Sequence, residues 1–277
     1  MTVFRPHDLQ DALDYLAEAP AMLIAGGTDV FPALGAMAAP DRALDLSALD
    51  ALRHVTRDGG GWRIGGGVTW AELCATDLPP AFDALKAAGR QIGSVQIQNT
   101  ATLVGNVCNA SPAADGVPVL MALDASVELC SLSGKRVVPI QSFVTGIRRT
   151  DLRPAEIVTA IHVPELSGDV RSGFEKLGSR AYLVISIASV AAVVGFEKGR
   201  VATARIVVGA CSPVPMRLDA LEADLIGEAA DKLPRAVASV HLAELCPIDD
   251  IRATAAYRLE AVEELLRRVL ATCGAGQ

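Results

Sequence analysis

The chain has 277 residues, of which 51% are hydrophobic, and its formal net charge is -7. The length accommodates one large domain or two modest ones, and the apolar content excludes a disordered chain. The acidic balance disfavours a nucleic-acid-binding protein, because phosphate recognition needs clustered Lys and Arg. The N-terminus shows no basic stretch followed by an apolar one, and apolar runs such as 184–194 are too short to span a membrane. We therefore expect a soluble, cytoplasmic protein.

The predicted elements of the first half alternate between helix and strand. An apolar strand over 22–25 runs directly into the sequence Gly-Gly-Thr-Asp at 26–29, and a helical pattern over 30–37 follows at once. Thr69 and Glu72 have the spacing of a capping box, which predicts that another helix begins there. Further strands are predicted at 43–46, 52–55 and 62–64, and a further helix at 80–89.

The segment 99–115 interrupts this alternation. It is dense in small and polar residues, and we expect it not to form an ordinary amphipathic helix. The polar stretch 166–169 is the predicted domain boundary, which separates a domain of residues 1–166 from one of residues 170–277. The second domain is predicted to hold strands at 172–177, 187–196 and 202–209, followed by helices at 218–226, 229–240 and 250–270.

Cysteine and histidine spacing gives no metal-binding pattern. The six cysteines include no C-x-x-C pair, and the four histidines are equally dispersed. We therefore expect no metal site in this chain. No catalytic triad can be assembled either, so we predict no catalytic residue, and Ser111 is interpreted as a ligand hydroxyl.

Two segments have the composition of ligand-binding loops. At 25–29, two glycines between a strand and a helix let backbone N–H groups approach an anion closely, next to the positive end of a helix dipole. At 102–115, a glycine again combines with hydroxyls and amides. A tight turn explains a lone glycine pair equally well, but the two together favour an extended ligand with a pyrophosphate at its middle. Neither segment matches the G-x-G-x-x-G fingerprint or a P-loop.

On these residues the chain resembles the FAD-binding medium subunit of the xanthine dehydrogenase and carbon monoxide dehydrogenase group of molybdenum hydroxylases. The likeness covers nearly the whole chain. It includes Ala-Gly-Gly-Thr-Asp at 25–29, Thr-Leu-Val-Gly-Asn at 102–106, Ala-Ser-Pro-Ala-Ala-Asp at 110–115 and Phe-Glu-Lys at 174–176. One departure is Val104, where the family's second loop carries a glycine. A β-branched residue restricts the backbone there.

The resemblance implies an α+β fold, with a two-lobed FAD-binding domain of the PCMH type and a smaller C-terminal domain of sheet and helices. It also implies that 23–30 and 102–106 hold the FAD diphosphate, that Ser111 and Asp115 contact the ribityl or nearby polar groups, and that Val158 and Lys176 approach the isoalloxazine. Ile92 falls where some relatives have an aromatic residue. The implied cofactor-binding residues are Leu23, Ile24, Ala25, Gly26, Gly27, Thr28, Asp29, Val30, Ile92, Thr102, Val104, Gly105, Asn106, Ser111, Asp115, Val158 and Lys176.

The function implied by the resemblance is electron transfer inside a heterotrimer. A large subunit would hold molybdopterin, a small subunit would hold [2Fe–2S] clusters, and this chain would pass electrons through FAD to NAD⁺, oxygen or another acceptor. Dimerisation of the heterotrimer, the substrate and the acceptor stay open. Two alternatives are an autonomous FAD-dependent oxidoreductase acting on a small substrate, and an assembly module that has lost its flavin, which only Val104 favours.

Overall fold

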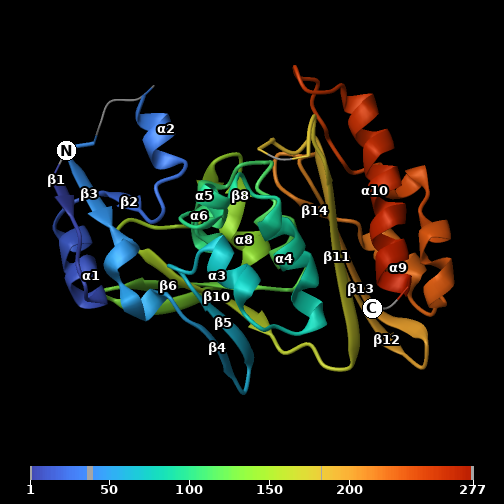
Figure 1. Cartoon of the computed structure of the whole chain (residues 1–277), viewed down its shortest axis with the longest axis horizontal. Coiled ribbons are helices and arrows are strands. Elements are labelled where there is room, and N and C mark those ends of the chain that lie inside the picture. The colour runs from blue at the N-terminus through green and yellow to red at the C-terminus, as the bar shows by residue number, and fades with distance from the viewer. Residues whose placement is uncertain (1, 36–39, 182, 276–277) are drawn as a thin grey trace.

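The computed structural model describes residues 2–35, 40–181 and 183–275. Their elements form three bodies in a row, namely a small N-terminal lobe, a middle lobe and a C-terminal domain (Figure 1). The expected α+β class is confirmed, and so is the order of a two-lobed domain followed by a domain of sheet and helices.

The N-terminal lobe is a three-stranded parallel sheet with helices at its side. Its strand order is β1-β3-β2, so β2 and β3 end at the same edge. The elements are β1 (Thr2–Phe4), α1 (Leu9–Glu18), β2 (Met22–Ile24), α2 (Val30–Leu34) and β3 (Arg42–Asp45). The lobe's core is small, with Leu13, Leu16 and Leu44 among its members, and it extends to Ile157 in the middle lobe.

The middle lobe combines a five-stranded antiparallel sheet, in the order β4-β5-β10-β6-β7, with six α-helices and the 3-10 helix Pro80–Phe82. Its strands are β4 (Val55–Asp58), β5 (Gly61–Gly65), β6 (Ser126–Ser131), β7 (Gly134–Pro139) and β10 (Ile157–Pro164), with a separate pair β8 (Val144–Gly146) and β9 (Arg149–Thr150). Its helices are α3 (Trp70–Ala75), α4 (Asp83–Arg90), α5 (Val95–Gln98), α6 (Leu103–Asn109), α7 (Gly116–Ala122) and α8 (Ile140–Phe143).

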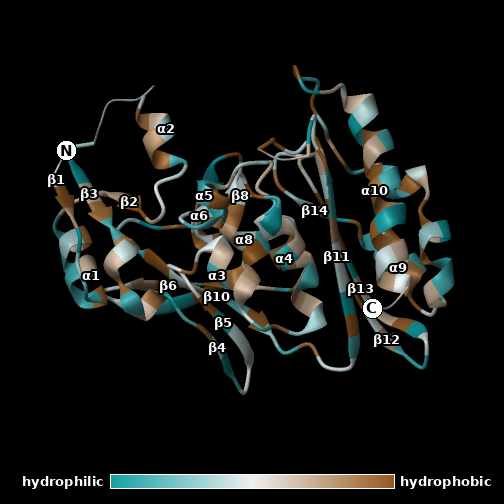
Figure 2. Ribbon diagram, viewed as in Figure 1, coloured by the Kyte–Doolittle hydropathy of each residue, from teal (hydrophilic) through white to brown (hydrophobic). Residues whose placement is uncertain are grey.

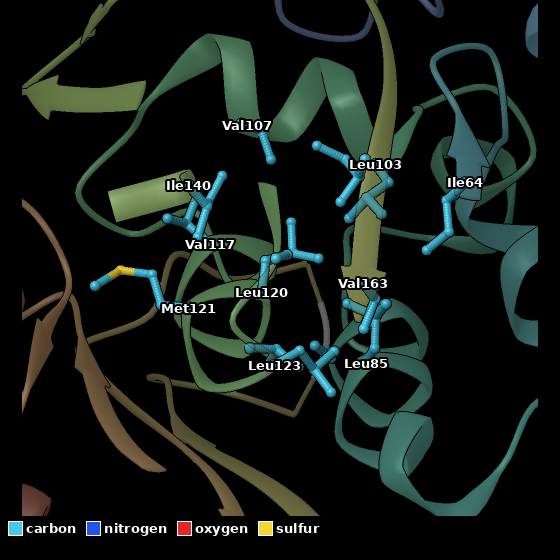
Figure 3. Close-up of a cluster of buried hydrophobic side chains, with 14 of the residues drawn as sticks. Ile64, Leu85, Leu103, Val107, Val117, Leu120, Met121, Leu123, Ile140 and Val163 are labelled. Carbon is cyan, nitrogen blue, oxygen red and sulfur yellow. The ribbon is translucent and has the colours of Figure 1, made fainter. Parts of the chain in front are cut away.

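The largest core of the protein lies between these helices and the sheet. Figure 3 shows Leu103 and Val107 of α6 lying over Leu120 of α7, with Ile64 and Val163 of the sheet beside them. Leu103, Val107 and Leu120 are completely buried. Burying a side chain of this size contributes about 1.5–3 kcal/mol each, so α6 is held firmly by its inner face.

The C-terminal domain is an antiparallel sheet of order β11-β12-β13-β14 that is covered on both faces. Its elements are β11 (Asp169–Leu177), β12 (Ala188–Glu197), β13 (Arg200–Gly209), β14 (Met216–Arg217), α9 (Asp219–Leu225) and α10 (Ala255–Ala275). Helix α10 packs on β11 and β12 from one side, while α4 and α7 of the middle lobe contact β11 and β13. Figure 2 shows α10 with both brown and teal positions, as expected for a helix with one face against the sheet.

The burial of β12 explains its almost continuous apolar sequence. Val190 and Val194 belong to the core under α10, whereas Ala191 and Val193 belong to the core shared with the middle lobe. Because successive side chains of a strand point to opposite faces, a strand covered on both sides needs apolar residues throughout. The middle lobe and the C-terminal domain therefore meet through a shared apolar core.

Four expectations for the helices were wrong in part. Within the segment 99–115, Leu103–Asn109 does form a helix, α6, because its polar residues Asn106 and Asn109 line a cavity. The helix expected at 229–240 is two short 3-10 segments, Ala230–Ala236 and Ser239–Leu242, and Pro234 interrupts the regular bonding of the first. The helix expected from residue 250 starts at Ala255. Of the helix expected at 30–37, α2 ends at Leu34, and residues 36 and 37 lie outside the described residues.

Candidate functional site

A cavity of about 720 Å³ separates the N-terminal lobe from the middle lobe. In Figure 1, β2 and α2 lie on one side of this region, and α5 and α6 lie on the other. The volume falls in the range of sites for small molecules and cofactors. Segments from five separate parts of the sequence line the cavity, so the fold assembles it from both lobes.

The first glycine loop forms one wall of the cavity. Gly27 has a φ of 69°, in the left-handed region that favours glycine. An added side chain at Gly26 would meet the main chain of the opposite wall, because its Cβ would lie 1.9 Å from the carbonyl oxygen of Thr100. The two walls therefore approach each other so closely at this point that only glycine fits.

The loop also presents unused hydrogen-bond donors. Among the described residues, the backbone N–H groups of Gly26, Gly27 and Thr28 have no recorded acceptor. The carbonyl of Gly27 accepts the N–H of Phe31 at 3.0 Å, which joins the loop to the first turn of α2. Free N–H groups in a turn at a helix start are the usual partners of phosphate oxygens.

The second loop is the first turn of α6. The Thr102 hydroxyl accepts the N–H of Gly105 at 2.9 Å and thereby caps the helix. Thr102 also forms an isolated antiparallel bridge with Thr69, the residue that caps α3. The capping box predicted for α3 is confirmed, because Glu72 accepts the N–H of Thr69 at 2.8 Å. The two helix starts are thus joined at the cavity.

Val104 fits this loop without distortion. Its backbone is helical, and its side chain is buried in the core of the middle lobe with 7% exposed. A β-branched side chain occupies a preferred rotamer in a helix. Val104 therefore occupies more space than the family's glycine would, but its backbone keeps the ordinary helical conformation.

Most residues expected from the sequence lie together on the cavity wall. They are Leu23, Ala25, Gly26, Gly27, Thr28, Asp29, Val30, Ile92, Thr102, Val104, Gly105, Asn106 and Val158. Ile24 is buried behind the first loop, and Ser111 instead accepts the N–H of Ala113 at 3.3 Å within its own turn. Neither belongs to the cavity lining.

Asp115 and Lys176 form a buried ion pair outside the cavity lining. The Lys176 ammonium lies 2.8 Å from one Asp115 oxygen, and the Ser186 hydroxyl donates to the other at 2.6 Å. Each charged side chain is only 4% exposed. The Lys176 ammonium also reaches the carbonyl of Gln91 at 3.4 Å, next to Ile92 of the cavity. The pair therefore joins the C-terminal domain to the middle lobe beside one end of the cavity.

Sequence reasoning missed part of the lining. Leu46 and Ser47 follow β3 and reach the cavity because β3 pairs with β2. Arg53 follows six residues after Ser47 and also lines the cavity. In the sequence, only its positive charge pointed to a role in binding an anion. The glycine run 65–67 suggests a strand-to-helix turn that could line the same ligand, and Gly66 and Gly67 do line the cavity. The other missed residues are Leu52, Thr69, Trp70, Ile97, Asn99, Thr100, Ala101, Cys108 and Leu152, whereas Asn109 is one of the amides expected in the second loop.

The chemistry of the lining suits a polar, anionic cofactor more than a metal. Among the described lining residues the ionisable side chains are Asp29, Arg53 and Cys108. Burial raises the pKa of the Cys108 thiol to about 12, so the thiol is protonated at neutral pH. In the part of the chain that the structure describes, no group of three or more His, Cys, Asp or Glu side chains could hold a metal ion.

No described helix is both long and apolar enough to cross a membrane.

Two features of the cavity fit FAD. Two glycine-bearing turns provide free N–H groups and space without a Cβ, which a diphosphate requires. Ile92, Ile97, Leu152 and Val158 supply apolar surface for aromatic rings.

Comparison with known proteins gives consistent results over the whole chain. Residues 1–166 match the family described as the FAD binding domain in molybdopterin dehydrogenase, and residues 174–273 match the CO dehydrogenase flavoprotein C-terminal domain. The chain is 31% identical to the xanthine dehydrogenase FAD-binding subunit of Escherichia coli O157:H7, over 96% of this chain and 93% of that one. It is 31% identical to the glyceraldehyde dehydrogenase medium chain of Sulfolobus acidocaldarius, over 94% of each.

A solved structure agrees with the fold. The structure of reconstituted CO dehydrogenase from Oligotropha carboxidovorans superposes with a TM-score of 0.92 at 25% identity, covering 100% of this chain and 98% of the matched chain. Both lobes and the C-terminal domain are thus accounted for by one known architecture. The chain belongs to the family of FAD-binding medium subunits of molybdenum hydroxylases.

Proposed function

We propose that this chain is the electron-transfer subunit of a heterotrimeric molybdenum hydroxylase. In this proposal a large partner subunit holds molybdopterin, and a small partner subunit carries electrons from it through [2Fe–2S] clusters to this chain. The electrons then leave to NAD⁺, oxygen or another acceptor. We also propose a cytoplasmic location and a division of the chain into domains of residues 1–166 and 170–277.

The observation that carries the proposal is the cavity between the two glycine-bearing turns. Residues 23–30 and 102–106 would hold the FAD diphosphate from opposite walls. Val158 and Ile92 would contact the apolar part of the cofactor. Ser111, Asp115 and Lys176 would act at its polar edge, Lys176 from the C-terminal domain. The Asp115–Lys176 pair supports this role, because the Lys176 ammonium lies 3.4 Å from the carbonyl of Gln91, next to Ile92 of the cavity.

FAD, when bound, supplies the redox chemistry, and the protein sets its position and surroundings. The first loop would neutralise part of the diphosphate charge through its N–H groups. The capped start of α6 would present the N–H of Val104 in the same direction, because the first N–H groups of a helix have no partner within it. The buried walls would exclude water from the apolar part of the cofactor.

The lining disfavours an autonomous oxidoreductase. A direct reaction on a small substrate needs an acid or base placed over the flavin. Among the described lining residues only Asp29, which lies on the first loop, is a carboxylate, and the Cys108 thiol cannot accept a proton at neutral pH because its raised pKa keeps it protonated. The flavin-free alternative rested on Val104, which the helix accommodates.

The test is isolation of a tagged chain together with its natural partners. We expect a molybdenum-containing large subunit and an iron-containing small subunit to co-purify with it. Reduction of the clusters in this complex should be followed by reduction of the flavin, which is measured as a loss of its visible absorbance. The proposal would be wrong if the isolated chain turned over a substrate at the full rate of the complex.

A further inference from the structure

The cavity contains one cationic side chain among its described lining residues, that of Arg53. The other ionised group of the lining is the Asp29 carboxylate, so the lining has no net charge. A cofactor with a diphosphate brings two negative charges into this space. Without Arg53, those charges would face Asp29 and uncharged groups only.

Arg53 is held in place by Glu72, with which its guanidinium forms an ion pair. Its side chain runs past Gly67, where an added Cβ would lie 3.2 Å from the Arg53 Cγ. Glu72 is itself fixed, because it accepts the N–H and the hydroxyl of Thr69 at 2.8 Å and 2.9 Å. Burial alone would raise the pKa of Glu72, but the hydrogen bonds from Thr69 and Arg53 lower it. Glu72 is therefore an anionic anchor at neutral pH.

The anchor leads to the second loop through contacts already described. Glu72 binds Thr69, Thr69 is bridged to Thr102, and the Thr102 hydroxyl caps the turn at Gly105. Arg53 is thus tied to the cavity wall that carries the second loop. The contact with Glu72 uses one of the five guanidinium N–H donors. Among the described residues, the remaining donors of Arg53 have no recorded acceptor.

We propose that Arg53 is a cofactor-binding residue that contacts the FAD diphosphate, with Glu72 as its positioning residue. The inference rests on the proposed FAD site. Arg is suited to this role because its planar guanidinium can bind a carboxylate with one edge and phosphate oxygens with the other. The side chain is 40% exposed, so its effect should depend on salt.

The experiment is a titration of the full-length, flavin-free chain with FAD at low and at moderate salt. We expect Arg53→Gln to weaken FAD binding about tenfold at low salt, and the loss to shrink as salt rises. Arg53→Lys should recover part of the affinity because it keeps the charge. ADP, which shares the adenosine diphosphate part of FAD but has a free terminal phosphate, should also lose affinity for Arg53→Gln.

The matched control is Arg57→Gln. Arg57 lies four positions along the chain, is paired with Glu165 at 2.9 Å and does not line the cavity. We expect it to bind FAD as the wild type does, with unchanged circular dichroism for all variants. The inference is overturned if Arg53→Gln keeps wild-type affinity, if Arg57→Gln loses as much, or if ADP binding does not change. Failure of the wild type to bind FAD at all would instead reject the proposed function, and the inference with it.

Discussion

The two loops that line the cavity are supported in opposite ways. The first loop lies on a thin three-stranded sheet with a small core, and its shape depends on glycines at 26 and 27. The second loop is the first turn of a helix whose Leu103 and Val107 are buried in the largest core of the protein. The comparison teaches that one half of the site depends on local backbone freedom and the other on packing. Substitutions should therefore separate cofactor affinity from stability.

Of the variants considered, Gly27→Val should show the largest effect, and the quantity that it changes should be the affinity for FAD. A valine whose backbone is held at a φ of 69° is strained, and its Cβ would lie 2.3 Å from a carbon of the Phe31 ring. Loss of two N–H bonds to a charged oxygen costs about 3–6 kcal/mol at about 1.5–3 each, which weakens FAD binding by about a hundredfold or more. Because Phe31 is 58% exposed and can turn aside, the chain should still fold.

The control for this variant is Gly59→Val, in the hairpin between β4 and β5. Gly59 has no atom within 4 Å of its Cβ position and no positive φ. FAD titration of both variants compares a cavity glycine with a surface glycine. Stoichiometric FAD and unchanged affinity in Gly27→Val would remove the first loop from the site.

Leu103→Ala should show the reverse behaviour, with a loss of stability. The side chain is completely buried, and such truncations cost about 2–5 kcal/mol of unfolding free energy. Urea unfolding of the flavin-free chain measures this loss. The comparison variant Leu132→Ala removes a side chain that is 51% exposed and should change stability by less than about 0.5 kcal/mol. Equal stability of the two variants would mean that α6 is not anchored by the core.

Thr102→Val should have the smallest effect of the three. It keeps the shape of the side chain but removes the hydroxyl that accepts the N–H of Gly105. Loss of a helix cap costs about 1 kcal/mol, so the urea midpoint should fall slightly. Thr102→Ser, which keeps the hydroxyl, should stay closer to the wild type. If the Val and Ser variants have the same urea midpoint, the Thr102 hydroxyl does not stabilise the second loop.

Local signals in the sequence were sufficient for the parts of the site that short segments build. The glycines at 26 and 27 were recognised from their place between a strand and a helix. The capping box of Thr69 and Glu72 was recognised from its spacing, and both partners bind as expected. These features depend on neighbours within a few residues, which a sequence displays directly.

The missing parts depend on contacts between distant segments. Ser47 reaches the cavity only because β3 lies beside β2 in a parallel sheet. Arg53 reaches it because Glu72, on another element, binds its guanidinium. Lys176 and Asp115 were expected as separate cofactor contacts, and their mutual pairing requires the C-terminal sheet to lie against the middle lobe. No local pattern contains this information.

The helix α6 shows a different limit. Its polar residues suggested an irregular loop because an amphipathic helix was assumed to turn its polar side to water. In the structure Asn106 and Asn109 line the cavity, while Leu103 and Val107 enter the core. A helix beside a cofactor site can therefore lack the usual surface composition.

The central claim is that this chain holds one FAD without a covalent bond, and acid precipitation of the purified, flavin-loaded chain tests it most directly. The account predicts a yellow supernatant that contains FAD in equimolar amount to the chain. Flavin retained in the pellet, FMN in the supernatant, or a chain that stays colourless after incubation with FAD would contradict it.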